Sequence, residues 1–115
     1  MVGLLDGNNR VRDDFEASDV FNQDSSTPTI FNQVFPTYLR AVTEGVNISA
    51  FVYGSTGSGK SHTFEGSGTD TGLAHLVSEN LFRLLEEKRY ERQNYNFRVR
   101  IRFLEILDEE VYDLL

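Results

Sequence analysis

The sequence predicts an α/β fold, and three patterns along the chain support this prediction. Between residues 27 and 45, apolar side chains recur at three- and four-residue intervals, as they do along one face of a helix. A short and nearly all-apolar run at residues 48–53 is typical of a strand buried on both faces. Residues 97–103 alternate between apolar and arginine side chains, which is the pattern of a strand with one polar face.

Composition limits the classes of protein to consider. The chain has 115 residues, which suits one domain at most, and its nine phenylalanines and five tyrosines supply enough apolar bulk for a core. With no cysteine there is neither a disulfide framework nor a thiolate metal site. A net charge of −7 argues against general affinity for nucleic acid or anionic lipid. No apolar run approaches the roughly 18–20 residues of a membrane span, so we expect no membrane partner.

The first half of the chain is expected to contain short strands and then one amphipathic helix. Residues 1–24 are typical of turns and short strands, with a turn at Asp6-Gly7-Asn8-Asn9. Thr27 is predicted to cap the helix and Pro28 to occupy its first position. Pro36 is predicted to kink or divide the helix, and Gly45 to end it.

The second half is predicted to contain two helices and the final strand. A glycine-rich loop follows the apolar run and leads into a helix, which a polar loop at residues 66–72 interrupts. A further helix is expected from about residue 73 to residue 89, because leucines and a valine share one of its faces.

The glycine-rich loop carries the chemistry. Its run Gly54-Ser55-Thr56-Gly57-Ser58-Gly59-Lys60-Ser61 fits the P-loop pattern G-x-x-x-x-G-K-[ST]. Glycines let successive backbone N–H groups surround phosphate oxygens, Lys60 brings a point charge to the β- and γ-phosphates, and the Ser61 hydroxyl suits Mg²⁺. A chance match in a flexible loop is the alternative, but the position between a predicted strand and a predicted helix favours nucleotide binding.

Other candidate residues have competing interpretations. His62 could stack on a nucleotide base, and a solvent-facing helical histidine fits its spacing equally well. His75 has no ligand partner at metal spacing and is interpreted as structural. Asp108 and Glu109 superficially resemble a second nucleotide-site motif, but an acidic turn after a strand is favoured because Glu105 interrupts the apolar run. The arginine face of residues 97–103 is interpreted as solvated rather than as a polyanion site.

At this point the chain resembles a known family, the kinesin motor domain. Residues 51–64 resemble the stretch F-A-Y-G-Q-T-G-S-G-K-T-[YH]-T-M, and residues 15–21 resemble F-x-F-D-x-V-F. Residues 44–47 resemble E-G-Y-N, and residues 103–115 resemble the end of S-Y-x-E-I-Y-N-E-x-V-Y-D-L-L. Four matches in the family's order are far more specific than the P-loop alone. They cover nearly the whole chain but only about the first third of such a motor domain.

The resemblance implies an incomplete P-loop NTPase-type three-layer fold, with residues 1–115 forming part of a motor domain. It implies binding of ATP and Mg²⁺ by Gly54, Ser55, Thr56, Gly57, Ser58, Gly59, Lys60, Ser61 and His62, with Ser61 on the metal and His62 on adenine. The resemblance also implies that the parent protein hydrolyses ATP to move along microtubules, and that it is located in the cytoplasm and on the cytoskeleton. Its contacts with tubulin would come from residues beyond Leu115.

Departures from the family pattern limit what these residues can do alone. Ser55, Ser61 and Phe64 replace the usual Gln, Thr and Met, and Ser61 keeps the hydroxyl. Asp13 stands where the family's R-x-R-P stretch would need proline. The switch stretches N-x-x-S-S-R and D-L-A-G-x-E are missing, so no catalytic residue is assigned and the isolated chain is expected to be inactive.

Two alternatives to a motor protein remain at this stage. The chain could be another P-loop ATPase, with Asp108 and Glu109 as the metal and water residues. It could also be a non-catalytic structural or binding module that retains the loop as a relic.

Overall fold

The N-terminal part of the chain forms a β-hairpin. The computed structural model describes residues 2–5 and 11–115. Strands β1 (Val2–Leu5) and β2 (Val11–Phe15) pair antiparallel, with Val2 opposite Phe15 and a register shift between Leu4 and Leu5. Short strands in this region are confirmed, whereas the predicted turn at residues 6–9 lies outside the described residues.

Helix α1 (Thr27–Thr43) forms where the apolar stripe predicts it, but it begins one residue earlier than predicted, so Pro28 takes its second position rather than its first. Its N-cap is Ser26 rather than Thr27, because the Ser26 hydroxyl accepts a hydrogen bond from the Thr29 amide at 3.3 Å. Pro36 lies inside the helix, which remains a single element. Gly45 follows the Glu44 C-cap with a φ of 94°, so the predicted stop at this glycine is confirmed.

The predicted interruption between two helices is a short hairpin. Helix α2 (Lys60–Glu65) leads into strands β3 (Gly66–Ser67) and β4 (Asp70–Thr71), and helix α3 (Leu73–Glu91) follows. Gly66 has a φ of 92°, and a Cβ added to it would lie 2.6 Å from the Gly72 nitrogen. Only glycine fits there without strain, so the hairpin can turn back tightly between the two helices.

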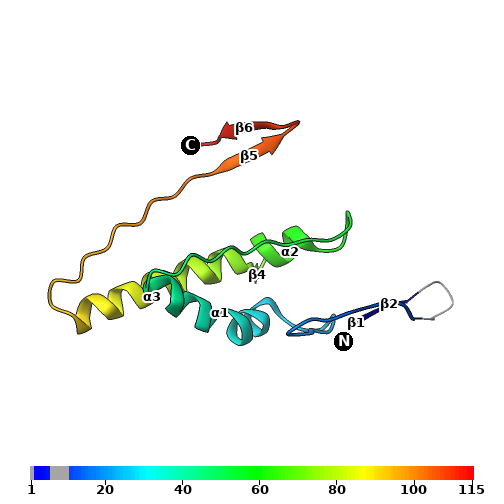
Figure 1. Cartoon of the computed structure of the whole chain (residues 1–115), viewed down its shortest axis with the longest axis horizontal. Helices are drawn as coiled ribbons and strands as arrows, with labels where there is room; N and C mark the ends of the chain where they lie inside the picture. Colours follow the sequence, from blue (N-terminus) through cyan, green and yellow to red (C-terminus); the bar gives the residue numbers. More distant parts are fainter. Residues whose placement is uncertain (1, 6–10) are drawn as a thin grey trace.

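The core of the described part lies between α1 and α3, which pack side by side (Figure 1). Phe31 and Leu39 of α1 are buried with Leu73 of α3, and Phe35 stacks on Phe31 with 5.6 Å between ring centroids. Partly buried side chains of both helices surround them: Ile30, Leu76, Val77, Leu81 and Leu84. The apolar stripes of the two helices thus meet as their spacing predicts.

Lys88 ties the C-terminal ends of the two helices together. Its ammonium group donates hydrogen bonds to the Thr43 carbonyl oxygen at 3.2 Å and to Glu44 Oε1 at 3.0 Å. This hydrogen bond and the positive charge of Lys88 hold the pKa of the Glu44 carboxyl below its usual value of 4.5.

We expect this contact to make the stability of the helix pair depend on pH. Since the folded-state pKa of Glu44 is lowered, the stabilisation is complete above about pH 4.5 and is lost as the pH falls through the folded value. Glu44→Gln should therefore lower the temperature at which half of the helical far-UV circular dichroism signal is lost at neutral pH, and should have no effect in strong acid. Glu79→Gln, which removes an exposed glutamate of α3, is the matched control and should shift the midpoint at neither pH.

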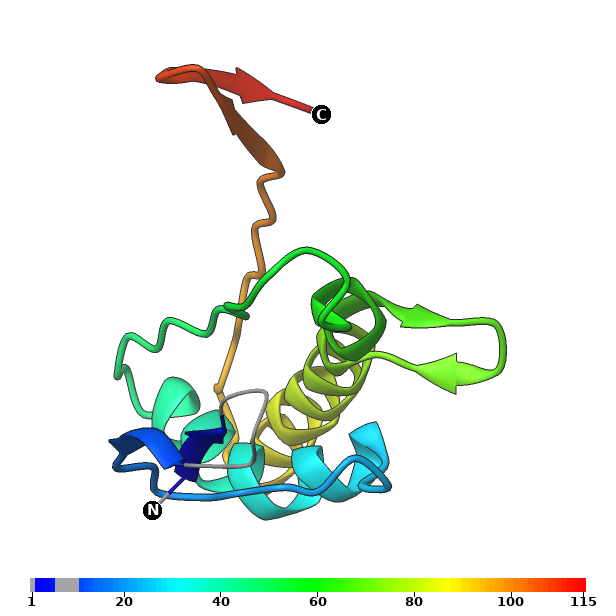
Figure 2. The same ribbon diagram turned by 90° about the vertical axis from the view of Figure 1, so that its right-hand side faces the viewer.

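Two predicted strands do not form strands in this structure. Residues 46–53 and 96–102 are extended but carry no ladder hydrogen bonds (Figures 1 and 2). The Phe103 carbonyl oxygen accepts a hydrogen bond from the Leu114 amide at 2.9 Å, at the end of the C-terminal hairpin. The prediction that residues 48–53 are buried on both faces is wrong here, since Phe51 is 85% and Tyr53 95% exposed. A strand needs a neighbour to satisfy its backbone groups, and among the described residues neither 46–53 nor 96–102 has a strand beside it.

The C-terminal end forms a second isolated hairpin. Strands β5 (Leu104–Leu107) and β6 (Glu110–Asp113) pair antiparallel and stand away from the helices in both views (Figures 1 and 2). Each sheet within residues 2–5 and 11–115 has two strands, so the three-layer arrangement is not formed in this part of the chain. The radius of gyration is 17.9 Å, against about 13 Å for a compact domain of this length. None of the described helices combines the length and apolar character needed to cross a membrane.

Candidate functional site

The glycine-rich loop lies between the extended segment 46–53 and α2 (Figure 2). Its residues 54–59 are exposed, and Gly59 precedes α2 with a φ of 88° in the left-handed region. This conformation is strained for any side chain with a Cβ, so glycine at this position lets the backbone turn sharply into the helix. The loop-then-helix arrangement predicted from the motif is confirmed.

The Lys60 side chain reaches back to the first residues of this loop. Its ammonium nitrogen donates hydrogen bonds to the carbonyl oxygens of Gly54 at 2.9 Å and Ser55 at 2.7 Å. An ammonium group has three donors, so one remains available. The loop therefore holds the Lys60 ammonium group, the one full positive charge among residues 54–61, close to the backbone amides of the loop. A phosphate group bound there could contact both the ammonium group and the amides.

The donor chemistry of the loop fits Mg²⁺ as a bridge to a phosphate group rather than as a closed protein site. Ser61 lies in the first turn of α2, is exposed, and its hydroxyl has no hydrogen-bond partner within the described part of the chain. Mg²⁺ prefers oxygen ligands, keeps several waters and is often shared with substrate phosphates. No cluster of three or more His, Asp or Glu side chains with metal-site geometry occurs among the described residues. Ser61 is thus the protein oxygen that would join such an ion.

His62 contributes to a polar pocket beside the loop. The pocket has a volume of about 770 Å³ and lies between Ser58 and Gly59 of the loop, the segment before α1, and the β3–β4 hairpin. His62 and Asp70 both line the pocket, and His62 Nε2 lies 3.4 Å from Asp70 Oδ2. The structure therefore brings His62 next to the loop and also brings in Asp70, which the sequence analysis did not single out.

The remaining candidates lie elsewhere. His75 is exposed on α3 and does not line this pocket. Asp108 and Glu109 form the turn between β5 and β6, both with positive φ, at 48° and 67°. Figures 1 and 2 show this turn apart from the glycine-rich loop, so the interpretation as an acidic turn is confirmed.

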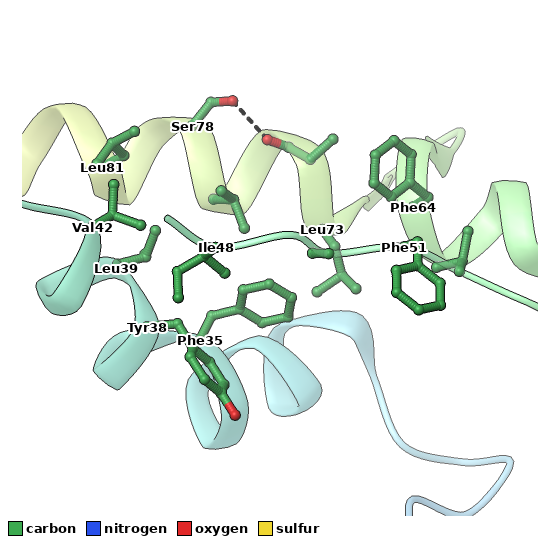
Figure 3. A pocket seen from close by; sticks show the side chains of 14 residues that line it. Phe35, Tyr38, Leu39, Val42, Ile48, Phe51, Phe64, Leu73, Ser78 and Leu81 are labelled. Carbon is green, nitrogen blue, oxygen red and sulfur yellow. Dashed lines mark hydrogen bonds between the residues drawn. The ribbon is translucent and has the colours of Figure 1, made fainter. Parts of the chain in front are cut away.

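A second, apolar cavity of about 370 Å³ opens between α1, α3 and the extended segment (Figure 3). Side chains of Phe35, Leu39, Ile48, Phe51 and Leu73 point into it from these three elements. The one hydrogen bond drawn there, from the Ser78 hydroxyl to the Ala74 carbonyl oxygen at 2.7 Å, stays within α3. This cavity offers no charged group to a phosphate and is separate from the candidate site.

Comparison with known proteins identifies a family. Residues 5–115 match the model of the kinesin motor domain. Similar proteins include kinesin-like protein KIN-14Q of Arabidopsis thaliana, 34% identical over 101 residues that make up 88% of this chain and 8% of that protein. Kinesin-like protein KIF18B of Mus musculus is 35% identical over 84% of this chain and 11% of its own length. Kinesin-like protein KIN-14J of Oryza sativa subsp. japonica is 40% identical over 88% of this chain and 12% of its own length. The chain thus spans roughly a tenth of the length of the curated relatives it matches.

Proposed function

The chain belongs to the kinesin motor domain family, and from this premise we propose that residues 54–62 form the ATP site of a microtubule motor. In this proposal the backbone of Gly54, Ser55, Thr56, Gly57, Ser58 and Gly59 cradles the phosphates, together with Lys60 and Ser61. His62 stacks on the base. The longer protein that carries these residues couples ATP hydrolysis to movement on microtubules, in the cytoplasm and on the cytoskeleton.

One observation carries the proposal more than any other, the placement of Lys60. Two carbonyl oxygens of the loop orient its ammonium group. The side chain is therefore positioned in advance, and a bound phosphate does not bear the full entropic cost of ordering a flexible lysine. A Gly/Ser loop without this function has no need to hold its lysine in this way.

The loop residues bind and orient the nucleotide but supply no group for the attacking water. The backbone amides and Lys60 would neutralise and align the phosphates, which is the main protein contribution to phosphoryl transfer. When bound, Mg²⁺ would stabilise charge on the β- and γ-phosphate oxygens. Ser61 would bind the ion through its hydroxyl oxygen. The switch stretches that would position the water are missing from residues 1–115.

Ser61→Ala tests the metal role. Removing this hydroxyl should weaken ATP binding in the presence of Mg²⁺ and leave binding in EDTA unchanged, because Ser61 acts through the ion. Isothermal titration of the longer protein under both conditions measures the two affinities. Ser58→Ala, which removes a hydroxyl from the same loop, is the control. Equal loss with and without Mg²⁺ would contradict the assignment.

The base is proposed to be adenine. His62 occupies the position that stacks on adenine in the family, and the guanine-reading N-K-x-D pattern is missing from the sequence. The preference for ATP over GTP should be modest, because stacking tolerates any base and contributes about 1–3 kcal/mol. His62→Ala should reduce affinity for both nucleotides, and unchanged affinity for both would contradict the stacking role.

We further propose that residues 1–115 are part of a three-layer P-loop domain completed by chain beyond Leu115. The exposed strand-like segment 46–53 and the open apolar cavity support this, since added strands would pair with the first and cover the second. Contacts with tubulin would also come from that later chain.

The rival ATPase mechanism predicts that Asp108→Asn abolishes hydrolysis in a folded protein, whereas this proposal predicts no direct catalytic effect.

A further inference from the structure

We propose that Asp70, carried on the β3–β4 hairpin, is a positioning residue for His62 at the base end of the nucleotide pocket. The proposal rests on the nucleotide site described above. It extends that site beyond the glycine-rich loop to the hairpin between α2 and α3. Asp70 itself need not touch the nucleotide, because its effect passes through the imidazole ring.

The geometry places both side chains on the same pocket. His62 Nε2 and Asp70 Oδ2 are 3.4 Å apart, and both residues line the cavity that begins at Ser58 and Gly59. A nucleotide whose phosphates lie at those loop residues can extend its base along this cavity. The imidazole ring that would stack on the base is therefore the one that Asp70 contacts.

The backbone fixes Asp70 in this position. Strands β3 and β4 contain two residues each, and Gly66 pairs with Thr71 while Ser67 pairs with Asp70. A Cβ at Gly66 would collide with the Asp70 carbonyl oxygen, so the close return of the hairpin depends on glycine there. Because the hairpin is short and begins directly after α2, Asp70 has little freedom to move away from His62.

Other charged side chains lie on the elements around this pair. Asp24, from the segment before α1, also lines the pocket, and α2 itself carries Lys60 and Glu65. None of the described residues lining the pocket comes from α3. The His62 and Asp70 side chains are 53% and 65% exposed, so the pair is worth only a small factor in affinity.

The test compares two ligands of the longer protein that carries these residues. Dissociation constants of ATP and of inorganic tripolyphosphate, which has no base, are measured by isothermal titration. Asp70→Asn should weaken ATP binding about two- to fivefold and leave tripolyphosphate binding unchanged. Glu79→Gln is the matched control, since it removes an exposed carboxylate from α3, which does not line the pocket, and it should leave ATP binding unchanged. In a His62→Ala background, Asp70→Asn should have no further effect.

Each other outcome overturns the proposal in a distinguishable way. If Asp70→Asn behaves like Glu79→Gln, or weakens ATP and tripolyphosphate binding equally, Asp70 does not act through the base. If its effect persists in the His62→Ala background, it does not act through His62. If the wild-type protein binds neither ligand, the proposed function fails and the role of Asp70 fails with it.

Discussion

Replacing Lys60 by alanine is expected to weaken ATP binding about 10- to 150-fold in the longer protein. The substitution removes the one full positive charge within residues 54–61, which the Gly54 and Ser55 carbonyl oxygens hold in place. A hydrogen bond from a charged donor to a phosphate oxygen is typically worth about 1.5–3 kcal/mol, which corresponds to this range of affinity. An equilibrium titration with a fluorescent ATP analogue measures the change.

The control for this prediction is Arg89→Ala. It removes the same charge from an exposed position in the last turn of α3, where Arg89 lies 3.6 Å from Glu86. The affinity for ATP should be unchanged in this variant. If Lys60→Ala is folded and binds ATP as well as the control does, the phosphate-binding role of the loop is wrong.

Residues 1–115 on their own are expected to show no ATP turnover, with or without microtubules. Phosphoryl transfer depends on a group that orients the attacking nucleophile, and neither switch stretch that supplies it in the family occurs in these residues. The net charge of −7 should also repel the acidic microtubule surface expected of the partner. Co-sedimentation of the purified chain with microtubules should therefore be negligible and insensitive to salt.

The isolated chain is also expected to be loosely folded or prone to aggregation. Within residues 16–115, the buried hydrophobic side chains are few: Phe31, Leu39, Leu73 and Leu85. The extended segments 46–53 and 96–102 present unpaired backbone groups and exposed apolar side chains, such as Phe51 and Ile101. Such edges favour pairing with other chains. A single sharp unfolding transition together with a monomeric mass would contradict this expectation.

The helices and the loop were predictable from sequence because local patterns specify them. Local sequence patterns are enough to predict the apolar stripe of α1, its end at Gly45 and the break between α2 and α3, because each involves residues close together along the chain. The cap at Ser26 was missed by one residue, since Ser26 and Thr27 carry equivalent hydroxyl groups and only the backbone conformation chooses between them.

The strands and one site residue were not predictable in the same way. Residues 48–53 and 97–103 have strand-like composition, but forming a strand depends on a partner that sequence pattern cannot supply. Asp70 follows no motif and approaches His62 only because β4 returns beside β3 to the end of α2. Its one sequence signal was the polar loop between two predicted helices. The predicted roles of residues 54–62 remain proposals that the experiments above test.

The most direct test of the central claim, that these residues are the nucleotide-binding part of a motor completed by later chain, is phosphate release with and without polymerised tubulin. The longer protein should hydrolyse ATP faster when tubulin is added, and residues 1–115 should show no turnover in either condition. Turnover by residues 1–115 that rises with tubulin would contradict the account, because it would place the catalytic machinery within this chain. The absence of any tubulin effect on the longer protein would contradict the proposed motor function.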